Sequence, residues 1–237
     1  MKWNDTDNRF VAFFDIMGFK NLVQTKSHAN ILKQMRQLAA IVNYIDSQEI
    51  VSKNSQSVLK STIFSDSIIL ISNNNTVSSA ANIMLHSSLL MTVAIRLGIP
   101  MKGCIAHGKF TADFENSIFF GQPLIDAYLL EEELSLYSIV LHNSFENHLI
   151  NKYYGGYKFR DNIRWFKYLT PLKVGKSQHY HLNWIFYGFL LNEKVDNSTK
   201  IEEFRKLINN FYLTVSGRTR SYVDNTVDFF EQLVAYK

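Results

Sequence analysis

The order of strand-like and helix-like segments constrains the fold of this 237-residue chain most strongly. Residues 9–16 form an apolar and aromatic run with little alternation, which predicts a central strand covered on both faces. Apolar residues recur at helical spacing over 30–46 and 77–97, and two short strands around a turn at 64–66 lie between those helices. A further strand is predicted over 101–110. Strand, helix, hairpin, helix and strand in this order predict an α/β fold with a ferredoxin-like βαββαβ core.

The rest of the chain predicts an elaboration of that core and then an extension. A strand, a helix, a strand and a helix are expected in turn over 117–120, 124–134, 137–141 and 143–153. Composition then becomes aromatic and basic, which favours strands up to about residue 187, and two amphipathic helices are expected around 201–215 and 223–234. We therefore expect a core of residues 1–153 and a strand and helix extension of residues 154–237 that packs on the core or on a dimer partner.

Composition and charge exclude several classes of protein. The single cysteine, Cys104, allows no intrachain disulfide, which favours a reducing compartment. The N-terminal residues lack the apolar core of a secretory signal, and no apolar run approaches the roughly 18 residues of a membrane helix. A net charge of +4 suits a phosphate-bearing ligand but is too small to indicate a nucleic-acid-binding protein. We expect a soluble, cytoplasmic protein with no membrane and no nucleic acid among its partners.

Two aspartates stand out because each interrupts an apolar strand region. Asp15 ends the first strand and Asp66 lies in the hairpin, and these strands can be neighbours in a βαββαβ core. Two nearby carboxylates repel unless a cation lies between them, and hard divalent cations bound to phosphates are held by one or two carboxylates. Gly18 would let the backbone approach a phosphate. An aspartate at a strand end is more often a turn or cap residue, however, and these residues alone leave both interpretations open.

Four segments of the sequence resemble class III nucleotidyl cyclases, in the order expected for that family. They read Phe-Phe-Asp-Ile-Met-Gly-Phe over 13–19, Phe-Ser-Asp-Ser-Ile-Ile-Leu over 64–70, Lys-Gly-Cys-Ile-Ala-His-Gly over 102–108 and Phe-Gly-Gln-Pro-Leu-Ile-Asp-Ala over 120–127. The resemblance covers residues 9–141, and the wording Asp-Ile-Met-Gly-Phe is most similar to the stand-alone pyrimidine cyclases of Pycsar anti-phage systems.

The resemblance implies a lyase in which the ribose 3′-oxygen of a nucleoside triphosphate attacks the α-phosphorus and releases pyrophosphate. It implies that Asp15 and Asp66 are catalytic and hold two divalent ions, Mn²⁺ or Mg²⁺, with the main-chain carbonyl of Ile16 as a further ligand. Gly18 and Phe19 would then bind the substrate. It also implies a head-to-tail homodimer with its sites at the interface, and a product that activates a separate cyclic-nucleotide-sensing effector during phage infection.

Departures from the family's pattern bear on the substrate. Adenylate enzymes read their base with a lysine and an aspartate, guanylate enzymes with a glutamate and a small polar residue, and Thr62 and Ile118 occupy those positions here. We expect both to be substrate-binding residues that disfavour ATP and GTP and favour CTP or UTP, giving cyclic CMP or cyclic UMP. The asparagine and arginine that stabilise the family's transition state are replaced by Ile125 and Leu129. Arg96 and Lys102 are basic candidates for that role, with no spacing argument for either.

Two alternatives to a cytidylate or uridylate cyclase stay open. One is a degenerate cyclase-like module that binds a nucleotide or a partner without turnover, which the missing asparagine and arginine favour. The other is a palm-domain nucleic-acid enzyme, which also uses two carboxylates to hold metal ions but needs a more basic channel. Other titratable residues predict structural roles: His179 and His181 could share a metal but are more simply surface or core histidines, and Glu131 belongs to an acidic run typical of a solvated helix face.

Overall fold

The computed structural model describes residues 3–47, 59–153, 165–185 and 196–235. Within these residues the strands are β1 (Thr6–Ile16), β2 (Leu59–Phe64), β3 (Ser67–Ser72), β4 (Met101–Asp113), β5 (Ile118–Gly121), β6 (Ile139–Leu141), β7 (Trp165–Leu172) and β8 (Gly175–Leu182). The helices are α1 (Phe19–Thr25), α2 (His28–Ser47), α3 (Val77–Arg96), α4 (Gln122–Glu133), α5 (Asn143–Tyr153), α7 (Asn197–Asn210) and α8 (Arg220–Ala235). The predicted domain boundary between residues 153 and 154 borders a segment outside this description.

The described strands form a single sheet of eight strands in the order β2-β3-β1-β4-β6-β8-β7, with β5 paired to β4. β1 lies antiparallel between β3 and β4, and β6 runs parallel to β4. The first four strands, with α2 after β1 and α3 after β3, form the predicted βαββαβ core. Strands β7 and β8 extend the same sheet, because β8 pairs with β6. The α/β fold class and its ferredoxin-like core are confirmed.

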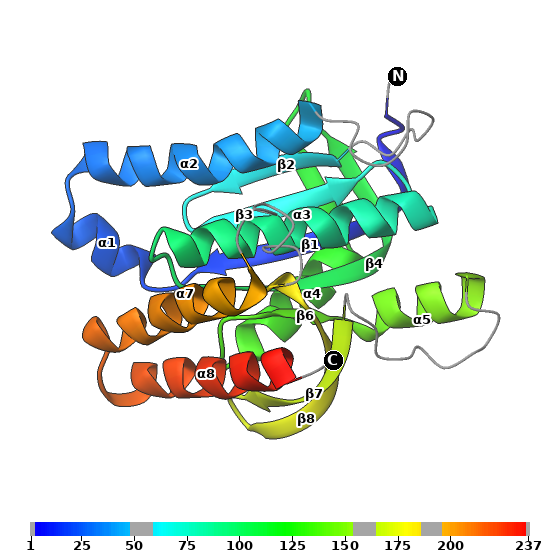
Figure 1. Cartoon of the computed structure of the whole chain (residues 1–237). Helices are drawn as coiled ribbons and strands as arrows, with labels where there is room; N and C mark the ends of the chain where they lie inside the picture. Colours follow the sequence, from blue (N-terminus) through cyan, green and yellow to red (C-terminus); the bar gives the residue numbers. More distant parts are fainter. Residues whose placement is uncertain (1–2, 48–58, 154–164, 186–195, 236–237) are drawn as a thin grey trace.

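Helices cover both faces of the sheet (Figure 1). Helices α2 and α3 lie on one face, with α7 and α8 continuing that layer toward β7 and β8, and α4 lies on the other face. Side chains alternate between faces along a strand, so Phe13 and Asp15 of β1 share a face. Tyr128 of α4 contacts the Phe13 ring edge-on, with ring centroids 5.5 Å apart. Asp15 therefore lies on the α4 face of the sheet.

Packing explains why β1 is a central strand. Its residues from Phe10 to Phe14 and Ile16 are buried, as the apolar run predicts. On the α3 face, Phe14 occupies the space above Gly103 of β4, where an added Cβ would lie 2.3 Å from a ring carbon. Gly103 is thus required by a close approach between neighbouring strands, and a larger residue there would displace the Phe14 ring.

Most predicted elements match the structure, and the differences have local causes. The hairpin turn at 64–66 and the helix over 143–153 are confirmed. Helix α1 was not predicted, because it has only seven residues, and Phe19 and Leu22, which pack against the core while partly exposed, span too short a stretch to show a helical period. The strand expected over 137–141 is shorter, Ile139–Leu141.

Helix α3 has the length and apolar composition of a membrane-spanning segment, the only such helix among the described residues. However, 78% of its most apolar window is buried inside the fold, where it packs against β1, β3 and α2. Its composition therefore fits a core helix.

Candidate active site

Asp15 and Asp66 lie at one corner of the sheet, which we call the aspartate corner. Asp15 pairs with Ser67, the residue after Asp66, so the prediction that their strands are neighbours is confirmed. The main-chain amide of Ile16 donates a hydrogen bond of 2.9 Å to the carbonyl oxygen of Asp66. Asp66 itself occupies a tight turn with Ser65, which adopts the left-handed conformation with φ 57°. Main-chain bonding thus fixes where the two carboxylates attach.

The aspartate corner holds negative charge that the protein compensates only in part. Burial raises the pKa of Asp15 above its usual 3.8, the Asp66 carboxylate raises it further, and Lys102 acts in the opposite direction. A carboxylate whose ionised form is destabilised by burial and by a neighbouring carboxylate is an oxygen donor that a hard divalent cation binds. The donor set therefore fits Mn²⁺ or Mg²⁺. Among the described residues, no group of three or more His, Cys, Asp or Glu side chains gathers at a metal-binding geometry, so any further ligands here would be main-chain oxygens, water or substrate.

The backbone after Asp15 turns sharply at Gly18. Gly18 adopts the left-handed conformation, with φ 73°, and α1 begins at Phe19. A side chain at residue 18 would strain this turn, which is why glycine suits it. The amide of Met17 donates to the carbonyl oxygen of Pro100 at 2.8 Å, so this turn is tied to the start of β4. Ile16, Gly18 and Phe19 thus adjoin the aspartate corner, where the sequence predicted them.

The structure places Thr62 and Ile118 very differently. Thr62 pairs with Ile69, and Ile69 pairs with Phe13, so Thr62 lies two strands from β1 on the face that carries Asp15. Ile118 pairs with Asp113 at the far end of β4, whereas Asp15 pairs with Lys102 near its start. Eleven residue steps of about 3.3 Å separate these two levels, about 35 Å of strand. Within a single chain, Thr62 therefore lies near the aspartate corner and Ile118 does not.

Helix α4 presents apolar side chains at the two positions that the sequence resemblance assigns to transition-state residues. Ile125 is 51% exposed and Leu129 is 54% exposed, and neither can hydrogen-bond a phosphate. Asp126, between them, accepts a hydrogen bond from the Gln122 amide at 2.8 Å and lies 3.7 Å from the ring of His142. Helix α4 therefore offers carboxylate and hydrocarbon, and no cation, at these positions.

The two basic candidates from the sequence are both engaged elsewhere. Arg96 lies 3.4 Å from the Glu203 carboxylate, with its guanidinium over the ring of Phe204. The Lys102 ammonium donates to the main-chain carbonyls of Glu131 and Glu132 at 2.9 and 3.2 Å. Both side chains are thus held by contacts within the chain.

Sequence reasoning missed the environment of Glu131. Its carboxylate lies 3.2 Å from the Lys102 ammonium, and the two side chains are 3% and 5% exposed. Burial raises the pKa of Glu131 to about 7, against the lowering influence of Lys102. The expectation of a solvated helix face is wrong for Glu131 and correct for Glu132, which is exposed. A helical projection of α4 was the available signal, since Glu131 follows Ala127 by four residues on the buried side.

The two histidines of β8 have structural environments. His181 is fully buried, and its ring nitrogens bond the hydroxyls of Ser138 and Thr170 at 2.9 and 2.7 Å. We call Ser138, Thr170 and His181 the buried histidine cluster. Burial lowers the pKa of His181 to about 3, so its ring is neutral at physiological pH. His179 bonds the Ser177 hydroxyl at 2.8 Å, and within the described part of the chain neither histidine belongs to a group of three or more side chains that could hold a metal.

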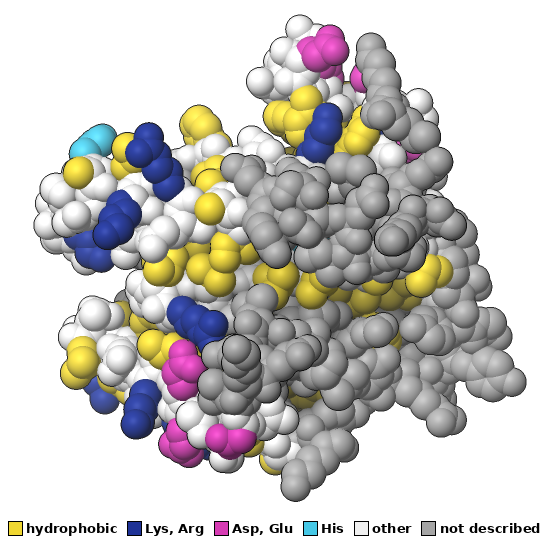
Figure 2. Space-filling view, turned by 45° about the horizontal axis from the view of Figure 1, so that its top comes forward, with side chains coloured by type: hydrophobic (Ala, Val, Ile, Leu, Met, Phe, Trp, Pro, Cys, Tyr) yellow, Lys and Arg dark blue, Asp and Glu magenta, His cyan; other side chains and the backbone are white. Residues whose placement is uncertain are grey.

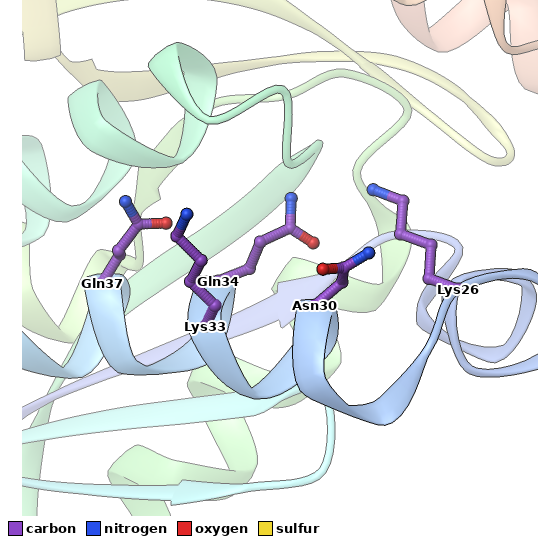
Figure 3. Close-up of a pocket in the computed structure, with 5 residues that line it drawn as sticks. All are labelled: Lys26, Asn30, Lys33, Gln34 and Gln37. Atoms are coloured by element: carbon purple, nitrogen blue, oxygen red, sulfur yellow. The ribbon is translucent and has the colours of Figure 1, made fainter.

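A hollow of about 360 Å³ lies elsewhere, along α2 (Figure 3). It is lined by long polar side chains, namely Lys26, Asn30, Lys33, Gln34 and Gln37. Figure 2 shows basic side chains on the outside of α2, and residues 28–41 of this helix include no Asp or Glu. None of the predicted site residues contributes to the hollow, and its lining is solvated helix surface.

Comparisons with known proteins bear on the fold. No protein-family model and no curated protein matches the sequence. The guanylate cyclase domain of RhGC from Catenaria anguillulae in complex with GTP aligns with a TM-score of 0.54 and 14% identity, over 76% of this chain and 98% of that one. The chain has the fold of a class III nucleotidyl cyclase catalytic domain.

Two other solved structures agree. The catalytic core of a rhodopsin-guanylyl cyclase with converted specificity, in complex with ATPαS, aligns with a TM-score of 0.53 and 14% identity over 77% of this chain and 98% of that one. A bacterial light-regulated adenylyl cyclase aligns with a TM-score of 0.51 and 9% identity over 79% and 98%. At such low identities the likeness concerns the fold alone.

Proposed function

We propose that this chain is a metal-dependent nucleotidyl cyclase that converts CTP or UTP to the 3′,5′-cyclic monophosphate and pyrophosphate. The observation that carries the proposal is the aspartate corner, where two carboxylates from adjacent strands repel each other at the edge of a cyclase-type sheet. A chain gains no stability from such repulsion, so the pair suggests a cationic ligand.

In this proposal Asp15, Asp66 and the carbonyl of Ile16 hold two divalent ions, Mn²⁺ or Mg²⁺. When bound there, such ions would supply charge neutralisation at the triphosphate and a lowered pKa of the ribose 3′-hydroxyl. The protein holds the carboxylates in place through the Ile16–Asp66 main-chain bond. The turn at Gly18 lets the backbone of residues 18 and 19 approach the phosphates without a side chain intervening. Positioning and electrostatics are the protein's main contributions to such phosphoryl chemistry.

The proposed pyrimidine preference rests on Thr62 and Ile118. Neither residue supplies the charged group with which purine cyclases of this class read their base. A pocket that lacks partners for the polar groups of a purine disfavours that purine, because those groups would be desolvated without hydrogen bonds.

We further propose a head-to-tail homodimer with sites at its interface. Ile118 lies about 35 Å of strand away from Asp15, so only a second copy can bring an Ile118 to the aspartate corner. The exposed apolar side chains of Phe64, at the aspartate corner, and of Ile118, Phe120, Ile125 and Leu129, on β5 and α4, support such an interface, because isolated chains rarely expose this much apolar surface.

By the sequence resemblance, the product would act in the cytoplasm as a second messenger for a separate effector in anti-phage defence. The second candidate function is a module that binds a nucleotide without turnover. The exposed Ile125 and Leu129 favour it, because α4 lacks a cation for the transition state.

The test is to incubate the purified chain separately with ATP, GTP, CTP and UTP and Mn²⁺, and to identify products by mass and retention time. We expect a cyclic monophosphate from CTP or UTP alone and none after chelation by EDTA. Cyclic AMP or cyclic GMP would contradict the pyrimidine proposal and leave the metal proposal standing. Binding of a triphosphate without product from any of the four would favour the second candidate.

A further inference from the structure

A buried ion pair connects β4 to α4 behind the aspartate corner. The Lys102 ammonium lies 3.2 Å from a Glu131 carboxylate oxygen, and both side chains are almost fully buried. The same ammonium donates to the main-chain carbonyls of Glu131, Glu132 and Leu134, at 2.9, 3.2 and 3.5 Å. An ammonium has three donors, so these acceptors at the end of α4 account for all of them. Lys102 therefore binds the C-terminal end of α4, the negative end of the helix dipole.

The strand end of this connection is the position opposite Asp15. Lys102 pairs directly with Asp15 in the β1–β4 ladder, so their side chains share a face of the sheet. The charge of Lys102 acts on Asp15 and that of Asp15 acts on Glu131. One cation thus faces the metal-binding strand on one side and α4 on the other.

A second contact joins the same helix to the same strand. Tyr128 of α4 meets the ring of Phe13, two residues before Asp15, at 5.5 Å. The aromatic contact and the ion pair hold α4 at two points along its length. Together they fix the rotation of the helix about its axis and its position over the sheet. The exposed residues Ile125 and Leu129 lie on this helix, so its placement decides what faces the aspartate corner of a partner.

We propose that Lys102 and Glu131 are positioning residues, which hold α4 in register with the Asp15 strand and contribute to turnover without touching substrate. This inference rests on the proposed cyclase function. Stability alone does not account for the pair, because buried ion pairs are often no more stabilising than well-packed apolar residues of the same size.

The chain offers a matched control one residue along the same helix. Lys173 lies 3.2 Å from Glu132, the same separation as in the buried pair, but these side chains are 32% and 49% exposed. The pair also touches the end of α4, so it reports what an ordinary surface ion pair does there.

The experiment compares wild type, Lys102→Met/Glu131→Leu and Lys173→Met. The double variant removes both charges together, since a single change would leave one charge buried without a partner and could prevent folding. Glu131→Gln, which keeps the shape and removes one charge, is the second variant. Each protein is assayed for kcat and KM with the preferred triphosphate, for melting temperature, and for amide hydrogen exchange across 122–133.

We expect the double variant to melt near wild type, to lose about 100-fold in kcat with KM within about threefold, and to exchange α4 amides about tenfold faster. Lys173→Met should match wild type throughout. Wild-type kcat in the double variant would overturn the positioning role, as would unchanged exchange in α4. If wild type forms no product from any triphosphate, the proposed function fails, and the exchange measurement alone then decides whether Lys102 and Glu131 hold α4.

Discussion

The aspartate corner and the buried histidine cluster are opposite solutions for polar side chains in one sheet. In the buried histidine cluster each ring nitrogen of His181 has a hydroxyl partner, and the ring is neutral. At the aspartate corner burial and the Asp66 carboxylate both raise the pKa of Asp15, and Lys102 gives only partial compensation. The first arrangement is satisfied by the chain itself, and the second is left with excess negative charge.

This difference separates residues that serve folding from residues that serve a ligand. Buried polar groups that find all their partners within the chain stabilise one packing arrangement, and they need nothing from outside. Like charges held together lower stability, so they make physical sense when a ligand neutralises them. The same contrast predicts opposite responses to mutation and to pH.

The largest expected effect comes from removing charge at the aspartate corner. Asp15→Asn and Asp66→Asn should each lower cyclic nucleotide formation by about 1000-fold, because each removes a ligand for the ions that stabilise the transition state. Neither variant should lower the melting temperature, since each relieves carboxylate repulsion. Product formation and thermal unfolding measure the two effects.

Asp7→Asn is the matched control, because Asp7 lies on β1 eight residues before Asp15 and on the same face. It should keep wild-type turnover. Retention of turnover in both Asp15→Asn and Asp66→Asn would contradict a ligand-binding role for the aspartate corner, because the two aspartates would then serve only as turn residues.

The second effect concerns stability rather than turnover. His181→Leu should lower the free energy of unfolding by about 2–4 kcal/mol, because it leaves the buried Ser138 hydroxyl without a partner and leaves the Thr170 hydroxyl only its bond to the Tyr168 carbonyl. Urea unfolding measures it, and turnover per folded molecule should not change. His179→Gln, at a partly exposed position of the same strand, should stay within about 0.5 kcal/mol of wild type. A fall in turnover per folded molecule in His181→Leu would assign this cluster a functional role.

The smallest effect is the pH dependence of stability, in which the two sites have opposite signs. Between about pH 6.5 and pH 3 the unfolded chain protonates His181 and the folded chain does not, so stability falls as pH falls. The difference in free energy of unfolding between wild type and His181→Leu should therefore be smaller at pH 5 than at pH 7. It should shrink by about 1.4 kcal/mol for each pH unit below 6.5.

Asp15 acts the other way, because its folded pKa is raised and the folded chain retains a proton that the unfolded chain has lost. Its contribution to stability therefore decreases as pH rises from the unfolded value through the folded one, and Asp15→Asn should remove that decrease. If the free energy of unfolding had the same pH dependence in wild type, His181→Leu and Asp15→Asn, the opposite signs predicted for the two sites would be contradicted.

Local pattern was enough for the secondary structure and for the aspartate corner. The apolar run before Asp15, the β-branched strand after Asp66 and the helical spacing of α2 and α3 are properties of neighbouring residues, so the sequence carries them directly. Asp15 lies at the end of β1 and Asp66 lies in the turn between β2 and β3. Because the order of elements makes β1 and β3 neighbours, the proximity of the two aspartates could be predicted. Helix α1 was not predicted because its seven residues are too few to show a helical period.

Burial and partnership across the fold were decided only by the tertiary structure. Lys102 and Glu131 lie 29 residues apart, and nothing in either segment marks them as an ion pair until α4 packs on β4. The acidic run at 131–133 looked uniformly solvated, yet one of its three members is buried because helix rotation is set by packing against the sheet. The sequence thus determined which residues carry charge and which segments are strands. The tertiary structure decided which charged groups have a hydrogen-bond or ion-pair partner, because only packing brings the partners together.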